Sequence, residues 1–461
     1  MPNDFWGAII NYVMKKDAST KDNKSKRKQV KKSVQFSAFY CAILLTLTRF
    51  VSFFLMHCRH KKSKAFKKEF RKGAMLILSN HLSAYDFINF SAPLHGHKVN
   101  YVVAENMMFA KPIFAKLITK YHAIPKRQYF ADFQCIKMIK KNLDAGISVV
   151  LCPEGKVSAD GKTGAISEST ARLVEWLGYP VAVCKLEGAS FVRPKWAYNK
   201  RNGRNFATYD LLFTKEDVQN LPKEEIYNRI VKALDHNEHE WHECTKIAFE
   251  GERYAEGLER LLYVCPKCNK EFELETKDDE IVCKACGNKI RYARTGELIA
   301  VGEDSHAFDR IDKWYDFERS LVAEQVKDEN FRLEDKVKLF VENEMRNGYR
   351  YICDGTISLD HEQVEFKADG DMRLKNVQPE FKVNNLDYEA QSDEMEPIED
   401  EFKSLKFNIS KSDTIATQPG TLLDFYDENH TYRFMMVNRL AATKYMLAVE
   451  EMFKNRTSHQ S

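Results

Sequence analysis

A histidine and an aspartate lie five positions apart in the segment Asn80-His81-Leu82-Ser83-Ala84-Tyr85-Asp86, directly after the apolar run 74–79. The run predicts a buried strand, and Ser83 followed three residues later by Asp86 resembles the pattern that begins a helix. Asp86 in the first helical turn can then reach back to the imidazole. It would hold His81 in one tautomer and stabilise its protonated form, which leaves the other ring nitrogen to take a proton from a hydroxyl. The alternatives are a loop histidine without catalytic work and an aspartate that only caps the helix.

Two further groups of polar residues follow apolar runs. After the run 148–152 come Pro153-Glu154-Gly155-Lys156, where the glycine allows a turn, the glutamate can hydrogen-bond a hydroxyl and the lysine supplies a cation. Ile124-Pro125-Lys126-Arg127 contains an arginine that can bind a phosphate through two hydrogen bonds. Since α/β folds bind ligands at the carboxyl ends of their strands, we expect one pocket for an anionic, hydroxyl-bearing substrate. Its predicted binding residues are Asn80, Lys126, Arg127, Glu154, Gly155 and Lys156.

The elements that must position these residues follow an α/β pattern from 74 to about 215. Predicted strands lie at 74–79, 99–104, 148–152, 180–185 and 207–213, and predicted helices at 84–91, 109–120, 130–144 and 166–177. A polar helical region then runs from Pro222 to about 262. A charged helical stretch from about 300 to 347 precedes short strand-like runs at 349–353, 364–366, 405–409 and 431–436. Strands closed by a final helix at 438–454 suggest a small barrel of the pleckstrin-homology or related type.

Four of the 11 cysteines form two pairs, Cys265-Pro-Lys-Cys268 and Cys283-Lys-Ala-Cys286, with 14 residues between the pairs. Each turn can present two thiolates to one tetrahedral Zn²⁺, and the residues between the pairs predict a hairpin, so we expect a zinc ribbon with a structural metal. A redox site would show a single pair on a helix. The other seven cysteines are scattered, which indicates a reducing compartment. We expect the ribbon to be a spacer or docking module, with no nucleic-acid partner.

The amino-terminal part is basic and apolar. The formal net charge is only +4, but residues 1–72 carry 18 Lys and Arg against 4 acids, which leaves −10 for the rest. An apolar run at 34–58 lies between basic clusters at 15–32 and 59–72 and contains Arg49. A span would put one cluster on the wrong side, so a helix lying in the cytoplasmic leaflet of an anionic membrane is favoured over a single apolar anchor. The alternative without a membrane is that the apolar run 34–58 forms a buried core helix.

In their order, the polar motifs resemble those of the glycerolipid acyltransferases of the lysophosphatidic acid acyltransferase type. The segment from Asn80-His81 to Asp86 looks like their first motif, NHxxxxD, and Pro153-Glu154-Gly155 like the core of their third, FPEGTRS. Arg127 falls where the second motif has its arginine, and Pro180 matches the proline of the fourth. The resemblance covers about residues 34–250.

The resemblance implies that His81 is the general base on a glycerol hydroxyl, with Asp86 as its partner. The donor would be an acyl thioester of coenzyme A or acyl carrier protein, attacked directly by the hydroxyl. Cys152, Lys156 and Val157 depart from the third motif, and Val157 replaces an arginine that the family uses near the acceptor phosphate. Lys156 can supply a positive charge there, but its ammonium group cannot make the paired hydrogen bonds that a guanidinium makes with a phosphate.

Together these features predict an α/β acyltransferase domain with amino-terminal membrane-associated helices, followed by a zinc ribbon and a strand-rich α+β carboxyl-terminal domain. The expected boundaries are 1–72, 73–262, 263–292 and 300–461. The expected reaction acylates a lysophospholipid, first of all 1-acyl-sn-glycerol-3-phosphate to give phosphatidate, at the cytoplasmic face of a membrane. Another lysophospholipid acceptor, or a non-catalytic lipid-binding or scaffolding protein, are the alternatives. A composition of 44% hydrophobic and 12% aromatic residues excludes a wholly disordered chain.

Overall fold

The protein is described by a computed structural model. It describes residues 37–104, 121–126, 132–342, 349–374, 377–382, 385–390, 394–410, 412–427 and 430–458. The chain forms two compact units, divided between Pro194 and Lys195, between Asn199 and Lys200, and between Glu250 and Gly251. We call them the amino-terminal unit, which contains 37–194 and 200–250, and the carboxyl-terminal unit, which contains 195–199 and the residues from Gly251 onward. The four predicted segments stay a prediction.

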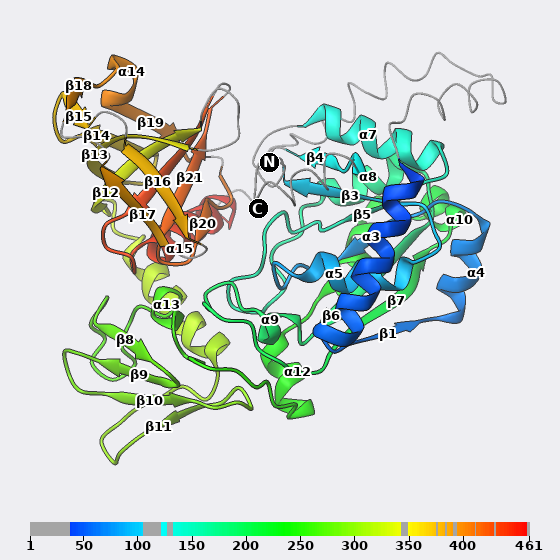
Figure 1. The fold of residues 1–461 in the computed structure, drawn as a ribbon, viewed down its shortest axis with the longest axis horizontal. Helices are drawn as coiled ribbons and strands as arrows, with labels where there is room; N and C mark the ends of the chain where they lie inside the picture. The colour runs from blue at the N-terminus through cyan, green and yellow to red at the C-terminus, as the bar shows by residue number, and fades with distance from the viewer. Residues whose placement is uncertain are drawn as a thin grey trace. The chain divides into compact units, whose positions relative to one another are not determined.

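A seven-stranded sheet forms the centre of the amino-terminal unit (Figure 1), in the order β1-β7-β6-β2-β5-β3-β4. Its strands are β1 (Cys58–Lys62), β2 (Leu76–Ser79), β3 (Val99–Ala104), β4 (Ile124–Lys126), β5 (Ser148–Leu151), β6 (Val181–Glu187) and β7 (Asn205–Phe213). Neighbours among β6, β2, β5, β3 and β4 are parallel, so all five carboxyl ends lie at one edge. β7 is antiparallel to β6, and β1 is parallel to β7.

Helices cover both faces of this sheet, because its central strands are apolar on both sides. They are α3 (Ala38–Phe50), α4 (Lys64–Lys72), α5 (Asp86–Ser91), α7 (Phe133–Asp144), α8 (Ser169–Leu177), α9 (Ala189–Val192), α10 (Lys215–Asn220), α11 (Lys223–Leu234) and α12 (Glu238–Thr245). Ile77 of β2 belongs to the core cluster with residues of α3, α4 and α5. Its neighbours Leu76 and Leu78 belong to the other cluster, with residues of α7, α8 and α11.

The five strands predicted between 74 and 213 are all present. β1 and β4 were not predicted, and the expected helix at 109–120 lies outside the described residues. The prediction of one long polar helix after Pro222 was wrong. The region forms two helices, α11 and α12, and is then irregular up to a short 3₁₀ turn at Leu258–Arg260. Asn237 fixes where the second helix begins, because its side chain caps α12 by accepting from the amides of His239 and Glu240.

The second basic cluster, 59–72, is part of the fold, whereas the sequence placed it in a membrane-associated segment ending at residue 72. Its residues form β1, which pairs with β7, and α4. α4 is amphipathic: Phe66 and Phe70 are buried, and Phe66 contacts Tyr209 of β7, while the lysines at the other positions face solvent. The spacing of two phenylalanines among the lysines decided this placement.

The apolar run before it forms α3, continued by one turn of π-helix at Val51–Leu55. Ala38–Leu55 is long and apolar enough to cross a membrane, and it is the one such helix among the described residues. One stripe of α3, made of Cys41, Leu44, Leu45 and Thr48, is buried against the unit. The opposite face exposes large apolar side chains, namely Phe39, Ile43, Leu47, Phe50, Phe53, Phe54 and Leu55.

The carboxyl-terminal unit contains a four-stranded ribbon sheet and a larger antiparallel sheet. The ribbon has the order β11-β10-β9-β8, with β8 (Leu274–Lys277), β9 (Glu280–Cys283), β10 (Lys289–Tyr292) and β11 (Leu298–Ala300). The hairpin predicted between the cysteine pairs is β8–β9. Helix α13 (Ile311–Gln325) follows. Of the predicted helical stretch from about 300 to 347, only Ile311–Gln325 is helical among the described residues, and alternating residues form β12 from Leu333 onward.

The larger sheet has seven strands in the order β19-β14-β13-β12-β22-β21-β20. They are β12 (Leu333–Glu342), β13 (Tyr349–Leu359), β14 (Gln363–Ala368), β19 (Ser404–Asn408), β20 (Ala416–Gln418), β21 (Leu422–Tyr426) and β22 (Thr431–Met436). Two small hairpin-like pairs, β15 (Met372–Leu374) with β18 (Met395–Pro397) and β16 (Val377–Lys382) with β17 (Asn385–Ala390), and the short α14 (Asp400–Lys403) lie between β14 and β19.

This sheet is strongly curled. Phe407 of β19 stacks on Phe425 of β21, with ring centroids 4.9 Å apart, although four strands separate β19 from β21 in the hydrogen-bonded order. The terminal helix α15 (Ala442–Ser458) is buried along one side, including Tyr445 and Leu447. A curled antiparallel sheet with a terminal helix agrees with the expected strand-rich α+β domain, and its pleckstrin-homology character stays a prediction.

Candidate active site

His81 and Asp86 are hydrogen-bonded at the carboxyl end of β2. Nδ1 of His81 lies 2.9 Å from Oδ2 of Asp86, whose side chain is fully buried, while 27% of the histidine side chain is exposed. The bond orients the ring so that Nε2 is free to take part in chemistry. The geometry predicted from the five-residue spacing is therefore present.

Backbone amides fix the aspartate. Oδ2 of Asp86 also accepts from the N–H of Leu82, at 2.6 Å, and of Ser83, at 2.9 Å. Burial raises the pKa of Asp86, and the hydrogen bonds from His81 and from these amides oppose that rise. α5 begins at Asp86 itself, and Ser83 is not its cap: its hydroxyl donates to the carbonyl of Arg193. Asp86 still makes the backward bond of a capping box.

Glu154 holds the histidine loop from the neighbouring strand. Its Oε1 accepts from the N–H of His81, at 2.8 Å, and its Oε2 from the N–H of Gly164, at 2.7 Å. Ser158 adds a third link, because its N–H donates to the carbonyl of His81 at 2.8 Å. Burial raises the pKa of Glu154 to about 7, against the two amide bonds and the nearby His81. The predicted bond from Glu154 to a substrate hydroxyl has no support in this geometry, since both oxygens face backbone amides.

Asn80 plays a similar part. It is fully buried, its Nδ2 donates to the carbonyl of Leu186 at 3.0 Å, and its Oδ1 accepts from the N–H of Leu186 at 2.8 Å. The side chain thus extends the pairing between β2 and β6 by one more rung. In this structure both polar atoms of the amide bond to the backbone of Leu186, which gives Asn80 a positioning role. The substrate contact predicted for Asn80 stays a prediction.

The cationic positions are less complete. Gly155 forms the predicted turn with a φ of 71°, a left-handed value that favours glycine, and Lys156 follows it, half-buried. Lys126 ends β4 at the same edge of the sheet, and burial lowers its pKa. Arg127 lies outside the described residues. The roles of these residues in binding substrate stay predictions.

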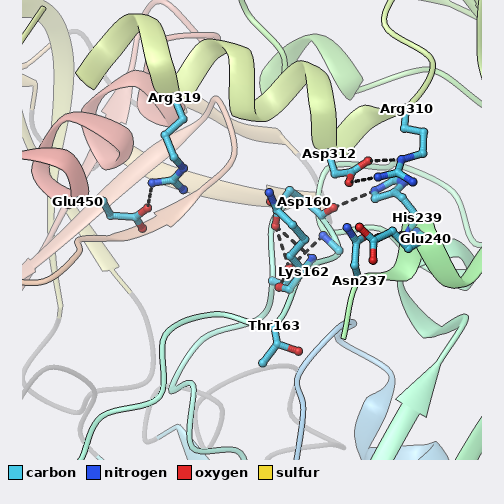
Figure 2. A network of polar contacts seen from close by, with 12 residues as sticks. Asp160, Lys162, Thr163, Asn237, His239, Glu240, Arg310, Asp312, Arg319 and Glu450 are labelled. Carbon is cyan, nitrogen blue, oxygen red and sulfur yellow. Dashed lines mark hydrogen bonds and ion pairs between the residues drawn. The ribbon is translucent and has the colours of Figure 1, made fainter. Parts of the chain in front are cut away.

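Sequence reasoning missed Glu238, a fully buried carboxylate that supports the segment after β6. It accepts from the N–H of Gly188 at 2.7 Å and from both the N–H and the hydroxyl of Ser190, at 3.0 and 2.8 Å. Next to it, Nε2 of His239 lies 2.8 Å from the carbonyl oxygen of Asp160, and Lys162 pairs with the Asp160 carboxylate (Figure 2). Nε2 of His236 also lies 2.7 Å from Oε1 of Glu238. No local pattern marks such a carboxylate, because Gly188 and Ser190 belong to a distant segment.

Residues 58–186 match the family model described as "Acyltransferase". This segment is an acyltransferase domain. It contains β1 to β5 and His81, Asp86 and Glu154, so the resemblance read from the motifs is confirmed at the level of the family. Among solved structures, the chain is similar to the 1-acyl-sn-glycerophosphate (LPA) acyltransferase PlsC from Thermotoga maritima, with 14% identity over 52% of this chain and 89% of that one and a TM-score of 0.36. No curated protein matches the chain.

Beyond the acyltransferase domain, the four paired cysteines meet in one cluster. The sulfurs of Cys265 and Cys286 are 3.7 Å apart, those of Cys268 and Cys283 are 3.8 Å apart, and all four lie within 4.8 Å of one another. Four ligands at the Zn–S distance of about 2.3 Å would be separated by about 3.8 Å at tetrahedral corners. The cluster therefore fits a zinc ion. Among the described residues it is the one group of potential metal ligands of this kind.

The two cysteine turns have the same backbone bonds. The N–H of Cys265 donates to the carbonyl of Lys270 and the N–H of Asn269 to that of Cys265; in the second turn, Cys283 bonds to Asn288 and Gly287 to Cys283 in the same way. Asn269 and Gly287 both have positive φ. Residues 258–296 match a zinc-ribbon family model described as "DNA directed RNA polymerase, 7 kDa subunit", which confirms the ribbon.

Helices α13 and α15 hold the ribbon within its unit. The N–H of Val264, directly before the first cysteine, donates to the buried Glu318 at 2.7 Å, and its carbonyl accepts from Nε1 of Trp314 at 2.9 Å. Lys444 of α15 binds both carboxylate oxygens of Glu271, at 2.8 and 2.7 Å. On the same two helices, Arg319 pairs with Glu450 (Figure 2). These contacts are typical of a structural module.

Proposed function

We propose that this chain is an O-acyltransferase that moves an acyl group from an acyl thioester to the free hydroxyl of a lysophospholipid at a membrane surface. The observation that carries the proposal is the His81–Asp86 pair, with its aspartate held by two backbone amides and its histidine accessible, at the carboxyl end of a central parallel strand. The match of residues 58–186 to the acyltransferase family supports it.

The pair can act as a general base. Because Nδ1–H of His81 donates to Asp86, the lone pair on Nε2 is available to take the hydroxyl proton as the oxygen attacks the thioester carbon. The buried carboxylate stabilises the imidazolium that forms, and it does not itself need to take the proton. Glu154 and Ser158 hold the backbone of the histidine, so that the ring keeps this position.

The reaction then balances without a covalent enzyme intermediate. The new C–O bond forms, the tetrahedral intermediate collapses with loss of the C–S bond, and the proton on Nε2 of His81 passes to the leaving thiolate. The donor would be acyl-CoA or acyl carrier protein, whose thiol is the leaving group. The side chains of the enzyme supply positioning and proton transfer. Proton transfer alone typically raises the rate about 10²–10⁴-fold.

For the acceptor we propose 1-acyl-sn-glycerol-3-phosphate, which gives phosphatidate, ahead of another lysophospholipid. Lys126 at the end of β4 and Lys156 after β5 are cations at the edge of the sheet that contains His81, and Arg127 follows Lys126 in sequence. Desolvation of Lys126, which lowers its pKa, is a cost that an anionic ligand would offset. Val157 stands where the resembled family has an arginine near the acceptor phosphate, so the headgroup is identified by the acceptor panel in the experiment below.

We further propose that α3 and its π-turn lie on the cytoplasmic leaflet and do not span the bilayer. A helix that crosses the bilayer alone is surrounded by lipid, whereas one stripe of α3 is packed into the core of the unit. The opposite, exposed apolar face is suited to the headgroup boundary. Arg59 lies 5.0 Å from the ring of Phe53, which puts a cation beside this face, where anionic lipids would meet it.

For the ribbon we propose a structural Zn²⁺ held by Cys265, Cys268, Cys283 and Cys286. A metal bound by four thiolates has no open coordination position, so it would contribute folding energy and no chemistry. The proposed partners are therefore the membrane, the lysophospholipid and the acyl donor, and no nucleic acid.

The test uses the purified full-length protein with radiolabelled acyl-CoA or acyl carrier protein and a panel of lysophospholipids. We expect product with one acceptor class, and His81→Ala lowers turnover by about 10²–10⁴-fold. Exposed His95 of the same unit provides the control, since His95→Ala should keep wild-type turnover. Circular dichroism and vesicle sedimentation check that folding and membrane binding persist. A His81→Ala variant with wild-type turnover would refute the assignment.

A further inference from the structure

A buried chain of polar side chains joins the exposed π-turn to the helix that begins with Asp86. Nε2 of His60 lies 3.1 Å from Oγ of Ser52, and that hydroxyl donates to Oδ1 of Asn89 at 3.1 Å. Nδ2 of Asn89 donates to Oδ1 of Asn205 at 3.1 Å, and Nδ2 of Asn205 donates to the carbonyl of Met56 at 2.6 Å. The chain therefore holds the π-turn Val51–Leu55 at both its ends.

Burying this hydrogen-bonded series of polar side chains has a cost in folding free energy. Ser52, Asn89 and Asn205 are at most 1% exposed, next to the apolar side chains that fill the space between α3 and the sheet. Burial, with the charges of Lys62, Arg49 and Arg59, lowers the pKa of His60 to about 4, so its ring is neutral and Nε2–H can donate to Ser52. A fully bonded buried network specifies one arrangement, whereas apolar side chains would allow several.

The two ends of the chain lie in functionally different places. Val51–Leu55 exposes Phe53, Phe54 and Leu55, the apolar residues at the end of the proposed membrane face. Asn89 lies one turn after Asp86 on α5, a helix of only six residues. One hydroxyl, that of Ser52, links the π-turn to Asn89, and Asn89 lies on the same short helix as the carboxylate that orients His81. A displacement of about 1 Å can cost about 10²-fold in rate at such a pair.

We infer that Ser52 and Asn89 are positioning residues that transmit the seating of Val51–Leu55 on a lipid surface to the His81–Asp86 pair. This inference rests on the proposed function. It predicts that the enzyme turns over a lysophospholipid faster in a vesicle than as a dispersed monomer, and that the difference depends on the Ser52 hydroxyl.

The first measurement does not need acyl transfer. Hydrogen–deuterium exchange of the amides at 82–92 is followed in the full chain with and without vesicles of phosphatidylcholine and phosphatidylglycerol. We expect slower exchange on vesicle addition in the wild type, and no slowing in Ser52→Ala, although the variant sediments with vesicles as before. Thr48→Val is the matched control, because its buried hydroxyl bonds only within α3, to the carbonyl of Leu45.

The second measurement compares kcat on a vesicle-borne acceptor with kcat on a short-chain acceptor below its micelle concentration. Ser52→Ala should lose about tenfold on vesicles and nothing on the monomer, with unchanged vesicle affinity. Equal losses on both acceptors, wild-type stimulation in Ser52→Ala, exchange at 82–92 that vesicles leave unchanged, or no binding to vesicles would each overturn the inference. Vesicle-dependent protection without acyl transfer to any acceptor would uphold the coupling and refute the proposed reaction.

Discussion

In the zinc ribbon, the first and last of the four cysteines are 21 positions apart in the sequence. The loop of His81 is instead held by long-range hydrogen bonds. Glu154 lies 73 positions from His81, and Leu186 lies 106 positions from Asn80. The ribbon is built from two copies of one local turn. The acyltransferase site is built from the ends of strands that the sheet brings together. We therefore expect the ribbon to form or fail as a unit with its metal, and the His81 site to fail residue by residue.

Metal removal gives the largest expected effect. Chelation, or Cys283→Ser, should remove one zinc per chain and lower the free energy of unfolding of the carboxyl-terminal unit by up to about 10 kcal/mol, because the ribbon cannot close without its ion. Metal analysis and hydrogen exchange at 258–296 are the measurements. Cys244→Ser, at an exposed cysteine outside the cluster, is the control. A metal-free chain with the same exchange at 258–296 would show that the two sites do not differ in this way.

Asp86→Asn tests the other side of the comparison. The amide cannot stabilise the imidazolium and favours the wrong tautomer of His81, so acyl transfer should fall by about 10²–10⁴-fold. Zinc content and exchange in the ribbon should stay at wild-type values. The exposed Asp210 of β7 provides the matched change, Asp210→Asn. Turnover within threefold of wild type would mean that Asp86 only caps α5.

Glu154→Gln should have a smaller, pH-dependent effect. The ionised carboxylate can accept from both His81 and Gly164, but an amide turns its NH₂ towards one of these donors, a mismatch worth about tenfold in turnover. Because burial raises the pKa of Glu154 to about 7, wild-type activity should rise with pH through 7 as the carboxylate ionises. The share of that rise that comes from Glu154 should be lost in Glu154→Gln, whereas the full rise should persist in Glu168→Gln, at an exposed position.

The same pKa also affects stability: whereas activity should rise with pH, the contribution of Glu154 to the free energy of unfolding should fall with pH. The folded-state pKa of Glu154 lies above its ordinary value of 4.5, so folding favours the protonated form. Its contribution is most favourable below pH 4.5 and is lost as the pH rises to about 7. Glu154→Gln should flatten this part of the curve of unfolding free energy against pH. An unchanged slope between pH 4.5 and 7 would place the pKa of Glu154 near its ordinary value.

Much of the architecture was predictable because it depends on short-range patterns. The five strands between 74 and 213 and the β8–β9 hairpin follow from the periodicity of apolar residues. The amino-terminal basic segment was harder to interpret, because its charge obscured the two phenylalanines that fix α4 on the sheet. The end of α13 at Gln325 was missed for a related reason, since β12 carries many charges on its exposed side.

What the sequence by itself determined are the contacts that one turn of chain can make. They are the reach of Asp86 back to His81 and the pairing of two cysteines in each ribbon turn. Only the tertiary structure decided that Glu154 and Asn80 hold backbone groups of distant segments, and that α3 has one buried and one exposed face. The physical reason is that a buried polar group must find a hydrogen-bond partner, and which partner is near depends on how the strands are ordered in the sheet.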